Sequence, residues 1–360
     1  MKKIILEAPV NNLSFGNVTY NLLRELYRRE MSVSFFPISG KLDFSSFDKI
    51  DPDFRQWIVS SGKSRFNTID KDTPSLKMWH LNSSEFRLGK KQSLYTFYEL
   101  DNPTDVEKSI ANLQDHAIFS SEHAARCFRL AGCENAVSIP IGFDEDFYPT
   151  NKDYMGDRIH FILMGKFEKR KHTQKIIKLW LKKYGDNPKY QLSCCVTNPF
   201  FKPDQMQQVI NSTLGGKRYF NINFLPFLPT NSEVNELLNS ADIDLTGLSG
   251  AEGWNLPAFN ATCLGKWSIV LNCTSHKDWA TPENSILVEP SGKESAADGV
   301  FFQEGQQFNQ GNIYTFNDDE VAEKMDAAID ICKKPNTEGE KLKETFTYKN
   351  TLDKILDLMK

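Results

Sequence analysis

Short apolar runs alternate with stretches of helical periodicity along this chain, and this alternation most limits the folds open to it. An apolar run at 4–6 precedes a stretch in which Val18, Leu22 and Leu26 recur at helical spacing. The continuous apolar run 159–164 is typical of a parallel sheet covered on both faces, and a second strand–helix series follows it. Two such series predict an α/β protein with two Rossmann-like, doubly wound domains.

The other expected elements extend the same alternation. Helices are expected to begin at Pro103, after a cap at Ser121, and at a capping-box-like pair of Asn317 and Glu320. A further amphipathic helix is expected at the end of the chain. The region 43–91 is less periodic and gives no prediction. Further strands are expected at 33–36, 94–97, 117–119, 192–196 and 222–225.

The length and one polar stretch predict how the chain is divided. Its 360 residues suit two domains, each with a core of its own. The polar stretch 148–158 separates the two strand–helix series. We therefore expect an N-terminal domain at 1–150, a C-terminal domain at 156–335 and a final helix at 340–360.

Composition excludes several classes of protein. With 40% hydrophobic and 25% charged residues, the chain resembles a soluble globular protein, and no run reaches the eighteen or so apolar residues of a membrane span. The apolar run in the first residues is too short for a signal peptide, so we interpret it as a first strand. Seven cysteines without a Cys-x-x-Cys pair predict reduced thiols in a cytoplasmic protein. The net charge of −4 argues against a general polyanion binder.

The stretch from Ser249 to Trp267 is the clearest candidate for a ligand site. It follows an apolar, strand-like run at 243–248, and its Gly250 and Gly253 allow tight backbone geometry. Pro257 suits the first turn of a helix, where a missing N–H group costs nothing. Free N–H groups and the positive end of a helix dipole would then face a ligand, and phosphate is the usual one.

Glu252 lies inside this stretch and can accept hydrogen bonds from hydroxyl groups of the same ligand. An ordinary strand–loop–helix connection with a solvated glutamate fits the same spacing. The spacing alone therefore leaves both interpretations open.

The stretch resembles the donor-site signature of the retaining GT-B glycosyltransferases of the large family four, also called group 1. That signature is Glu-Gly-Phe-Gly-Leu-Pro, followed by Glu-Ala-x-Ala-x-Gly-x-Pro-Val. One departure is that the family's second glutamate, eight positions after the first, is Asn260 in this chain. Here the motif reads Glu252-Gly253-Trp254-Asn255-Leu256-Pro257, then Asn260-Ala261, Gly265 and Ile269-Val270.

The resemblance implies a role for each part of this motif. Glu252 would contact the donor sugar, and backbone N–H groups from Gly253 to Leu256, including those of Trp254 and Asn255, would support phosphates or sugar. Asn260 would hold the ribose, because an amide can donate and accept hydrogen bonds. It lacks the charge of the family's glutamate, which weakens any nucleotide preference inferred from the family.

A second stretch, from Met164 to His172, resembles the family's Gly-Arg-x-x-x-x-Lys-Gly segment and also follows a strand. Gly165 takes the glycine position, Lys166 the arginine position and Lys171 the lysine position. The resemblance implies that these two cations clamp the nucleotide diphosphate and stabilise its growing charge as the sugar leaves. A lysine lacks the bidentate fork of an arginine, so the phosphate geometry is expected to be looser. Downstream, Lys175, Lys178 and Lys182 are interpreted as a solvated helix face.

The first half of the chain offers further candidates. Gly16 is expected in a loop after the first strand, which in the family closes over the donor phosphates; a plain turn fits equally well. The stretch 94–107 resembles the family segment that carries a His or Asp facing the sugar and acceptor, which makes Glu99 a candidate polar or acid–base group. A Gly-x-Asp element near the domain junction corresponds to 139–149. His80 is a candidate to line the cleft, although a lone histidine is more often structural.

Taken together, the resemblance implies a GT-B enzyme with a central cleft between its domains and a final helix that crosses back to the first. The reaction would move a hexose or pentose from a nucleotide diphosphate sugar, UDP-linked in the leading interpretation, with retention. The acceptor hydroxyl would belong to a saccharide, a lipid-linked sugar or a small metabolite. A donor phosphate oxygen would take its proton, so no protein nucleophile is needed. Neither a metal nor a cofactor beyond the donor co-substrate is implied.

Two alternatives remain open at this stage. Some virus-encoded GT-B enzymes glycosylate hydroxymethylated bases in DNA, and the basic run 166–183 gives slight support to a DNA acceptor. Asn260 prompts a second alternative, a nucleotide-sugar-binding module without turnover. Asp242 and Asp244 form an Asp-x-Asp, which in another glycosyltransferase fold binds metal, but here we interpret them as structural.

Overall fold

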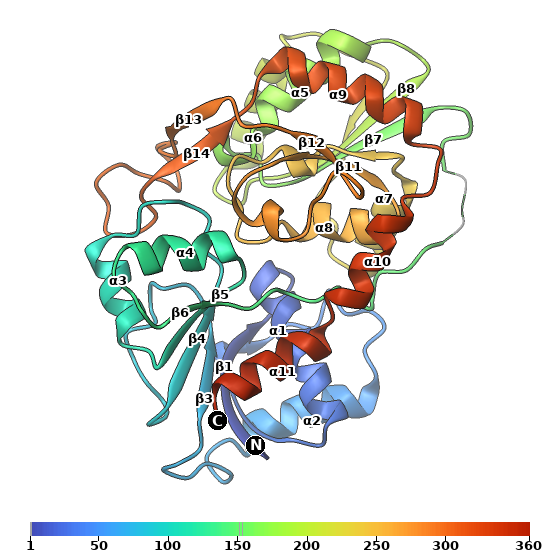
Figure 1. Cartoon of the computed structure of the whole chain (residues 1–360). Helices are drawn as coiled ribbons and strands as arrows, with labels where there is room; N and C mark the ends of the chain where they lie inside the picture. Colours follow the sequence, from blue (N-terminus) through green and yellow to red (C-terminus); the bar gives the residue numbers. More distant parts are fainter. Residues whose placement is uncertain (1, 151, 153) are drawn as a thin grey trace.

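The computed structural model describes residues 2–150, 152 and 154–360, which form two lobes (Figure 1). The N-terminal lobe contains a parallel sheet in the order β2-β1-β3-β4-β5-β6. Along the chain, β2 is added on one side of β1 and the later strands on the other, so the order of the strands reverses direction between β1 and β3. Its strands are β1 (Lys3–Val10), β2 (Ser32–Leu42), β3 (Ser75–Met78), β4 (Gln92–Thr96), β5 (His116–Phe119) and β6 (Ala136–Ser138). Its helices are α1 (Ser14–Arg28), α2 (Pro52–Lys63), α3 (Asp105–Asn112) and α4 (Glu122–Leu130).

The C-terminal lobe contains a second parallel sheet, in the order β12-β11-β10-β7-β8-β9, whose growth reverses between β7 and β10. Its strands are β7 (Ile159–Gly165), β8 (Tyr190–Val196), β9 (Ile222–Phe224), β10 (Ile243–Asp244), β11 (Trp267–Leu271) and β12 (Ile286–Val288). Its helices are α5 (Thr173–Tyr184), α6 (Pro203–Thr213), α7 (Asn231–Ser240), α8 (Leu256–Cys263) and α9 (Asp318–Ile331), with short 3₁₀ turns η1 (Lys169–Lys171), η2 (Thr246–Leu248) and η3 (Thr274–Asp278). The two sheets confirm the predicted α/β class with two Rossmann-like halves.

The end of the chain returns to the N-terminal lobe. Helix α10 (Thr337–Thr345) packs on α8, and α11 (Tyr348–Leu358) packs on α1, beside both chain ends in Figure 1. The return path touches the linker after β6: Phe143 N donates to Phe346 O at 2.8 Å, and a Cβ on Gly142 would lie 2.2 Å from Tyr348 N. Because Leu352 is fully buried among residues of β1 and α1, α11 is part of the N-terminal core.

A hairpin of the C-terminal lobe also reaches the first lobe. We call it the hairpin arm, residues 292–315, with strands β13 (Gly292–Ser295) and β14 (Asn312–Thr315). Lys293 Nζ lies 2.7 Å from Asp101 Oδ2, and Asn309 N donates to Glu107 Oε1 at 2.8 Å. Both acceptors belong to the first lobe, so the arm connects the two lobes at the edge where β13 and β14 are labelled in Figure 1.

Two expectations about the motif loops are wrong. The run 243–248 is not one strand, because β10 ends at Asp244, whose Oδ1 accepts from Thr246 N at 3.0 Å and turns the chain into η2. Gly16 does not lie in a loop: it belongs to the first turn of α1, buried against the backbone of Asn11, where a Cβ would lie 2.2 Å from the carbonyl oxygen.

Two expected helix starts are adjusted and one is confirmed. Pro103 precedes α3 rather than beginning it, because Thr104 is the N-cap. Asn317 caps α9 as expected, but Glu320 does not complete a capping box and instead accepts from Glu289 N at 3.0 Å. Ser121 caps α4 through Ala124 N, as predicted.

The unparsed region 43–91 contains α2 and β3. Asp51 caps α2, and Pro52 occupies its first position, a start signal that the sequence already carries. Among the described residues, every helix is too short or too polar to cross a lipid bilayer.

Candidate active site

The candidate residues lie where each sheet reverses its direction of growth. In open α/β sheets, ligands bind outside the carboxyl ends of the strands at such switch points. In the C-terminal lobe, the loops after β7 and β10 carry the two motifs found in the sequence. In the N-terminal lobe, the first turn of α1, which follows the loop after β1, carries Phe15, and the loop after β3 carries Trp79 and His80. The two lobes therefore bring four switch-point loops together.

Ion pairs join the two C-terminal motifs. Lys171 Nζ lies 2.5 Å from Glu252 Oε1, and an Arg170 guanidinium nitrogen lies 3.1 Å from Glu252 Oε2. Arg170 also lies 2.8 Å from Glu168 Oε1 and donates to the carbonyl of Ala251. All four charged side chains are largely buried, so each charge is held by its partner rather than by water.

Burial and pairing set the protonation of this cluster. Burial raises the pKa of Glu252, but Arg170 and Lys171 outweigh it and hold that pKa well below its ordinary value. Burial lowers the pKa of Arg170, but Glu252 and Glu168 outweigh it and raise that pKa. Glu252 is therefore a carboxylate and Arg170 a cation across the physiological range.

Glycines allow the close approaches on which this arrangement depends. Gly165 has φ +119°, and a Cβ there would lie 3.0 Å from Lys171 Cδ, so only glycine leaves room for the lysine stem. A Cβ on Gly253 would lie 2.9 Å from the Cβ of Phe97, which belongs to the other lobe. Ser120 Oγ donates to the Gly253 carbonyl at 2.7 Å, so the donor-motif loop and the N-terminal lobe are in direct contact.

Lys166 lies beside the cluster but is held differently. Its Nζ lies 5.7 Å from the ring centre of Phe200 and 5.5 Å from that of Phe301, within cation–π range. Among the residues that the structure describes, no carboxylate lies within ion-pair distance of it. His80 approaches from the other lobe: burial, with a contribution from Lys166, lowers its pKa to about 4. His80 is therefore neutral at pH 7 and does not repel an anion bound there.

Glu99 faces the same cluster from the N-terminal lobe. Burial raises its pKa above the ordinary value; Arg170 opposes this, and Glu252 adds to it. This direction makes Glu99 a weaker acid than a solvated glutamate. The structure thus brings Glu99, Lys166, Lys171 and Glu252 together, as the sequence predicted, although their chemical roles remain predictions.

The rest of the donor motif uses its side chains for structure. Trp254 is buried and its carbonyl accepts from Trp279 Nε1 at 3.2 Å. Asn255 has φ +68° at the N-cap of α8, and its Nδ2 donates to Thr246 O at 3.0 Å. Leu256 begins α8, whose first backbone N–H groups have no partner within the helix. What this loop can offer a ligand is therefore mainly its backbone, which is the role predicted for it.

Asn260 lies one turn further along α8. It is 5% exposed, and its Oδ1 has no hydrogen-bond partner among the described residues. An unpaired buried amide oxygen costs about 1–3 kcal/mol. Gly16, also predicted to bind the donor, packs against Asn11 in the first turn of α1.

Sequence reasoning missed three supporting residues. Arg170 and Glu168 lie between the two predicted lysines, at positions that the family segment leaves unspecified. His276 follows β11, and its Nε2 accepts from Asn255 Nδ2 at 2.9 Å while its Nδ1 lies 2.8 Å from Leu271 O. This pattern places the proton on Nδ1 and fixes the orientation of the Asn255 amide. The sequence signal that could have identified His276 is its position five residues after the buried strand β11, where the loops of the site begin.

His276 is expected to make stability depend on pH. Burial lowers its pKa from 6.5 to about 4; Glu252 opposes this shift, while Lys171 and Arg170 add to it. Its contribution is complete above pH 6.5 and is lost as the pH falls towards 4, because the unfolded chain then binds the proton more readily. The excess stability of the native chain over His276→Asn is expected to shrink by about 2 kcal/mol between pH 7.5 and pH 5. Urea unfolding of both chains at each pH measures it, and an unchanged difference contradicts it.

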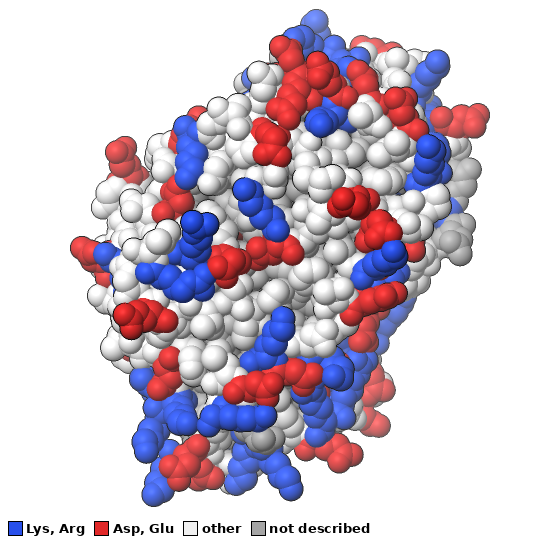
Figure 2. Space-filling model, in the orientation of Figure 1, with Lys and Arg blue, Asp and Glu red and all other residues white. Residues whose placement is uncertain are grey.

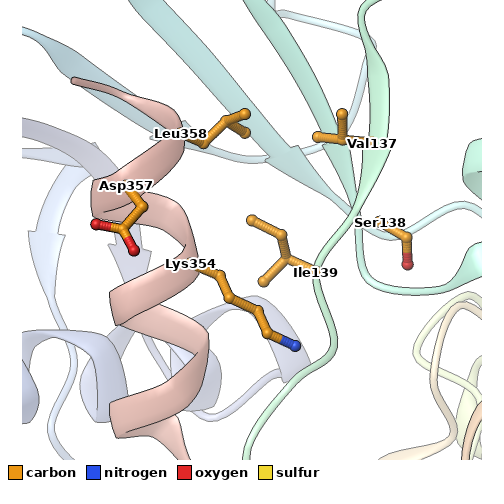
Figure 3. A pocket seen from close by; sticks show the side chains of 6 residues that line it. All are labelled: Val137, Ser138, Ile139, Lys354, Asp357 and Leu358. Carbon is orange, nitrogen blue, oxygen red and sulfur yellow. The ribbon is translucent and has the colours of Figure 1, made fainter.

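One hollow in the described surface lies elsewhere. It measures about 350 Å³ and lies between β6 and α11, lined by Val137, Ile139 and Leu358 among others. Figure 3 shows Ile139 directed towards α11 and Ser138 pointing away from it. None of its lining residues belongs to the four switch-point loops, so this hollow is separate from the candidate site. Within the described ranges, no group of three or more His, Cys, Asp or Glu side chains is arranged to hold a metal ion.

Comparison with known proteins identifies the fold. No family model matches the chain, and no curated protein does. HepE from Anabaena, solved with UDP and glucose, is 13% identical over 99% of both chains, with a TM-score of 0.66. Sucrose-phosphate synthase from Thermosynechococcus elongatus is 14% identical over 99% of this chain and 98% of its own, with a TM-score of 0.66. TarM is 14% identical over 81% of this chain, with a TM-score of 0.58; only 55% of TarM is covered, so the chain spans about half its length. The chain therefore has the GT-B fold.

Proposed function

We propose that the protein is a retaining glycosyltransferase that moves a sugar from a nucleotide diphosphate sugar to an acceptor hydroxyl. One observation carries the proposal. Arg170, Lys171 and Glu252 form one cluster at the switch point of the C-terminal sheet, Lys166 lies beside it, and Glu99 faces it from the other lobe. Such a cluster suits a ligand that combines a diphosphate with a hydroxyl-rich ring.

The cations would bind and stabilise the diphosphate. Lys166 has aromatic rings rather than a carboxylate around its amine, so its charge is available to an anion. Lys171 is held against Glu252 in the ligand-free chain. A diphosphate placed between the two lysines would take over the Lys171 contact, while Arg170 keeps Glu252 paired. These cations can supply the positive charge that the leaving diphosphate needs, which is why we propose a metal-independent reaction.

The neighbouring groups would hold the rest of the donor. Glu252 would accept hydrogen bonds from sugar hydroxyls, and the first N–H groups of α8 would support a phosphate. The unpaired Oδ1 of Asn260 would accept a hydrogen bond from a ribose hydroxyl. HepE has been solved with UDP and with UDP-glucose, and this supports a UDP-linked donor as our first choice.

The chemical step needs no protein nucleophile. The bond between the anomeric carbon and the diphosphate oxygen breaks, with the electron pair staying on the diphosphate. The acceptor oxygen bonds to the same carbon on the same face, and its proton passes to a diphosphate oxygen. Contact between Gly253 and the N-terminal lobe would exclude water, which otherwise competes as acceptor. Glu99 would hydrogen-bond to the reacting sugar or acceptor.

A DNA acceptor finds no support in the structure. On the face drawn in Figure 2, the Lys and Arg side chains of the described residues are interspersed with Asp and Glu rather than joined in one basic surface. A groove that tracks a phosphate backbone needs such a surface. We therefore propose a saccharide, lipid-linked or small-molecule acceptor.

Nucleotide diphosphates are expected to stabilise the folded chain. A ligand that binds only the native state raises stability by about 2.7 kcal/mol at a hundred times its dissociation constant. A thermal-shift screen of UDP, GDP, ADP and their sugars measures this, with nucleosides as controls that lack the diphosphate. Release of free nucleotide diphosphate from the best sugar donor then distinguishes an enzyme from a binding module. Failure of every diphosphate and sugar to shift the transition would remove the proposal.

A further inference from the structure

Two exposed phenylalanine rings stand beside Lys166. Phe200 follows β8 and is 52% exposed, and Phe301 lies in the loop of the hairpin arm and is 40% exposed. Their ring centres are 5.6 Å apart, and the Lys166 amine lies near both. The two rings come from separate elements and converge while remaining exposed. An exposed apolar ring adds little to the stability of the fold, so such a pair indicates a binding site.

The loop that carries Phe301 is held in place before any ligand arrives. Asp298 Oδ1 accepts from the backbone N–H groups of Val300, Phe301 and Phe302 at 2.8–3.0 Å. Phe302 is 2% exposed and packs into a core that includes residues of the N-terminal lobe, while Phe301 faces outward. Lys169 Nζ secures the arm by donating to Ser295 O at 2.6 Å. The exposed ring is therefore presented on a rigid support, which lowers the entropic cost of binding.

Their position relative to the proposed donor limits what the rings can bind. Asn260, assigned to the ribose, is on α8, which packs with α7 and α10; α5 packs with α6 and α9 instead. In Figure 1 these two groups of helices lie on opposite sides of the C-terminal strands. Phe200 lies between β8 and α6 along the chain, and α6 belongs to the group of helices on the side away from α8. The nucleoside would thus extend away from the rings.

The acceptor, by contrast, must come close to Lys166. The anomeric carbon is one bond from the diphosphate oxygen that Lys166 would hold, and the acceptor hydroxyl must bond to that carbon. For attack on the face of the leaving group, the acceptor lies beside the diphosphate rather than opposite it. Phe200 and Phe301 form exposed surface that borders the Lys166 amine.

We propose that Phe200 and Phe301 form an acceptor platform that binds a pyranose ring, so that the acceptor is a saccharide. The proposal rests on the glycosyltransferase function proposed above. A pyranose ring presents a face of C–H groups that packs on an aromatic ring, while its hydroxyls project from the rim towards polar groups. The Lys166 amine borders this platform, and neutral His80 lies near that amine.

The experiment separates acceptor binding from donor binding. The native chain, the double variant Phe200→Ala/Phe301→Ala and the control Phe220→Ala are compared in the presence of saturating UDP. Phe220 is a matched control: it is 61% exposed on the same lobe, but it precedes β9 at the opposite end of the sheet. Each labelled chain is applied to an array of immobilised gluco-, galacto- and manno-configured mono- and disaccharides and their N-acetylated forms. UDP affinity and release of UDP from UDP-sugars are measured in parallel.

The expected result is that the double variant binds its saccharide roughly tenfold more weakly while keeping native UDP affinity and donor hydrolysis. The control is expected to match the native chain in every measurement. Loss of UDP affinity in the double variant overturns the proposal, since the rings would then serve the donor, directly or by positioning Lys166. Native saccharide binding by the double variant overturns it too, as does a native chain that hydrolyses donor but binds no saccharide. A native chain that neither binds nor hydrolyses any donor contradicts the glycosyltransferase function itself.

Discussion

A chain with Lys171→Met is expected to transfer sugar about 10²–10³-fold more slowly than the native chain, the usual effect of removing one charge-stabilising group from an active site. In the native chain, the Lys171 amine lies 2.5 Å from Glu252 Oε1, at the point where we place the leaving diphosphate. The fold is expected to survive, because Glu252 keeps Arg170 at 3.1 Å and is not left as an unpaired buried charge. Initial rates under saturating donor, with thermal unfolding of the same samples, measure both effects.

Lys178→Met provides the matched control. Lys178 is exposed on α5, seven residues after Lys171, and carries the same charge. It is expected to keep the native rate, because a solvated charge on a helix face is screened and contacts no substrate. Equal rates for Lys171→Met and Lys178→Met would show that the leaving group is stabilised elsewhere.

Arg170→Met is expected to have the largest effect on stability, a loss of about 3–5 kcal/mol in the free energy of unfolding. The side chain is 6% exposed and holds Glu168, Glu252 and the carbonyl of Ala251. Methionine fills a similar volume but leaves Glu168 as a buried carboxylate without its cation. Glu252 is expected to lose its fixed orientation as well, so turnover falls together with stability. Urea unfolding at pH 7.5 measures the first effect.

A second substitution tests whether the unpaired charge is the cause. Adding Glu168→Gln to Arg170→Met removes that charge and is expected to recover part of the lost stability. The single Glu168→Gln variant completes the cycle, and its coupling to Arg170→Met gives the energy of the pair. A loss below about 1 kcal/mol for Arg170→Met, or no recovery in the double variant, argues against a strongly stabilising pair.

Local signals predicted most of the fold. Continuous apolar strands such as β7 and caps such as Ser121 are recognisable because neighbouring residues alone determine them. Gly16 was misplaced because a single glycine does not distinguish a loop from a helix turn that is packed against another backbone. The extent of β10 was overestimated because the hydrogen bond of Asp244 to Thr246 N turns the chain while the apolar pattern continues.

The candidate site was only partly predictable for a related reason. The sequence identified Lys171 and Glu252 because each belongs to a motif of fixed spacing. It did not identify Arg170 as their partner, because Arg170 and Glu252 are 82 residues apart and their pairing depends on how two loops meet at the edge of the sheet. Phe200 and Phe301 belong to no motif, and only the position of the hairpin arm brings them to Lys166. Contacts that depend on how the two lobes are arranged cannot be predicted from short sequence motifs.

The return of α11 to the N-terminal lobe has a consequence for biosynthesis. The apolar cluster around β1 and α1 is completed by Leu352 and Ile355, which leave the ribosome after the whole second lobe has been made. Domains generally fold as units in order of synthesis. Here, part of the apolar core of the first lobe is expected to stay exposed to water and to chaperones until translation of the second lobe is complete. A nascent chain released at residue 345 should accordingly be cut by proteases mainly in its first half and not in its second.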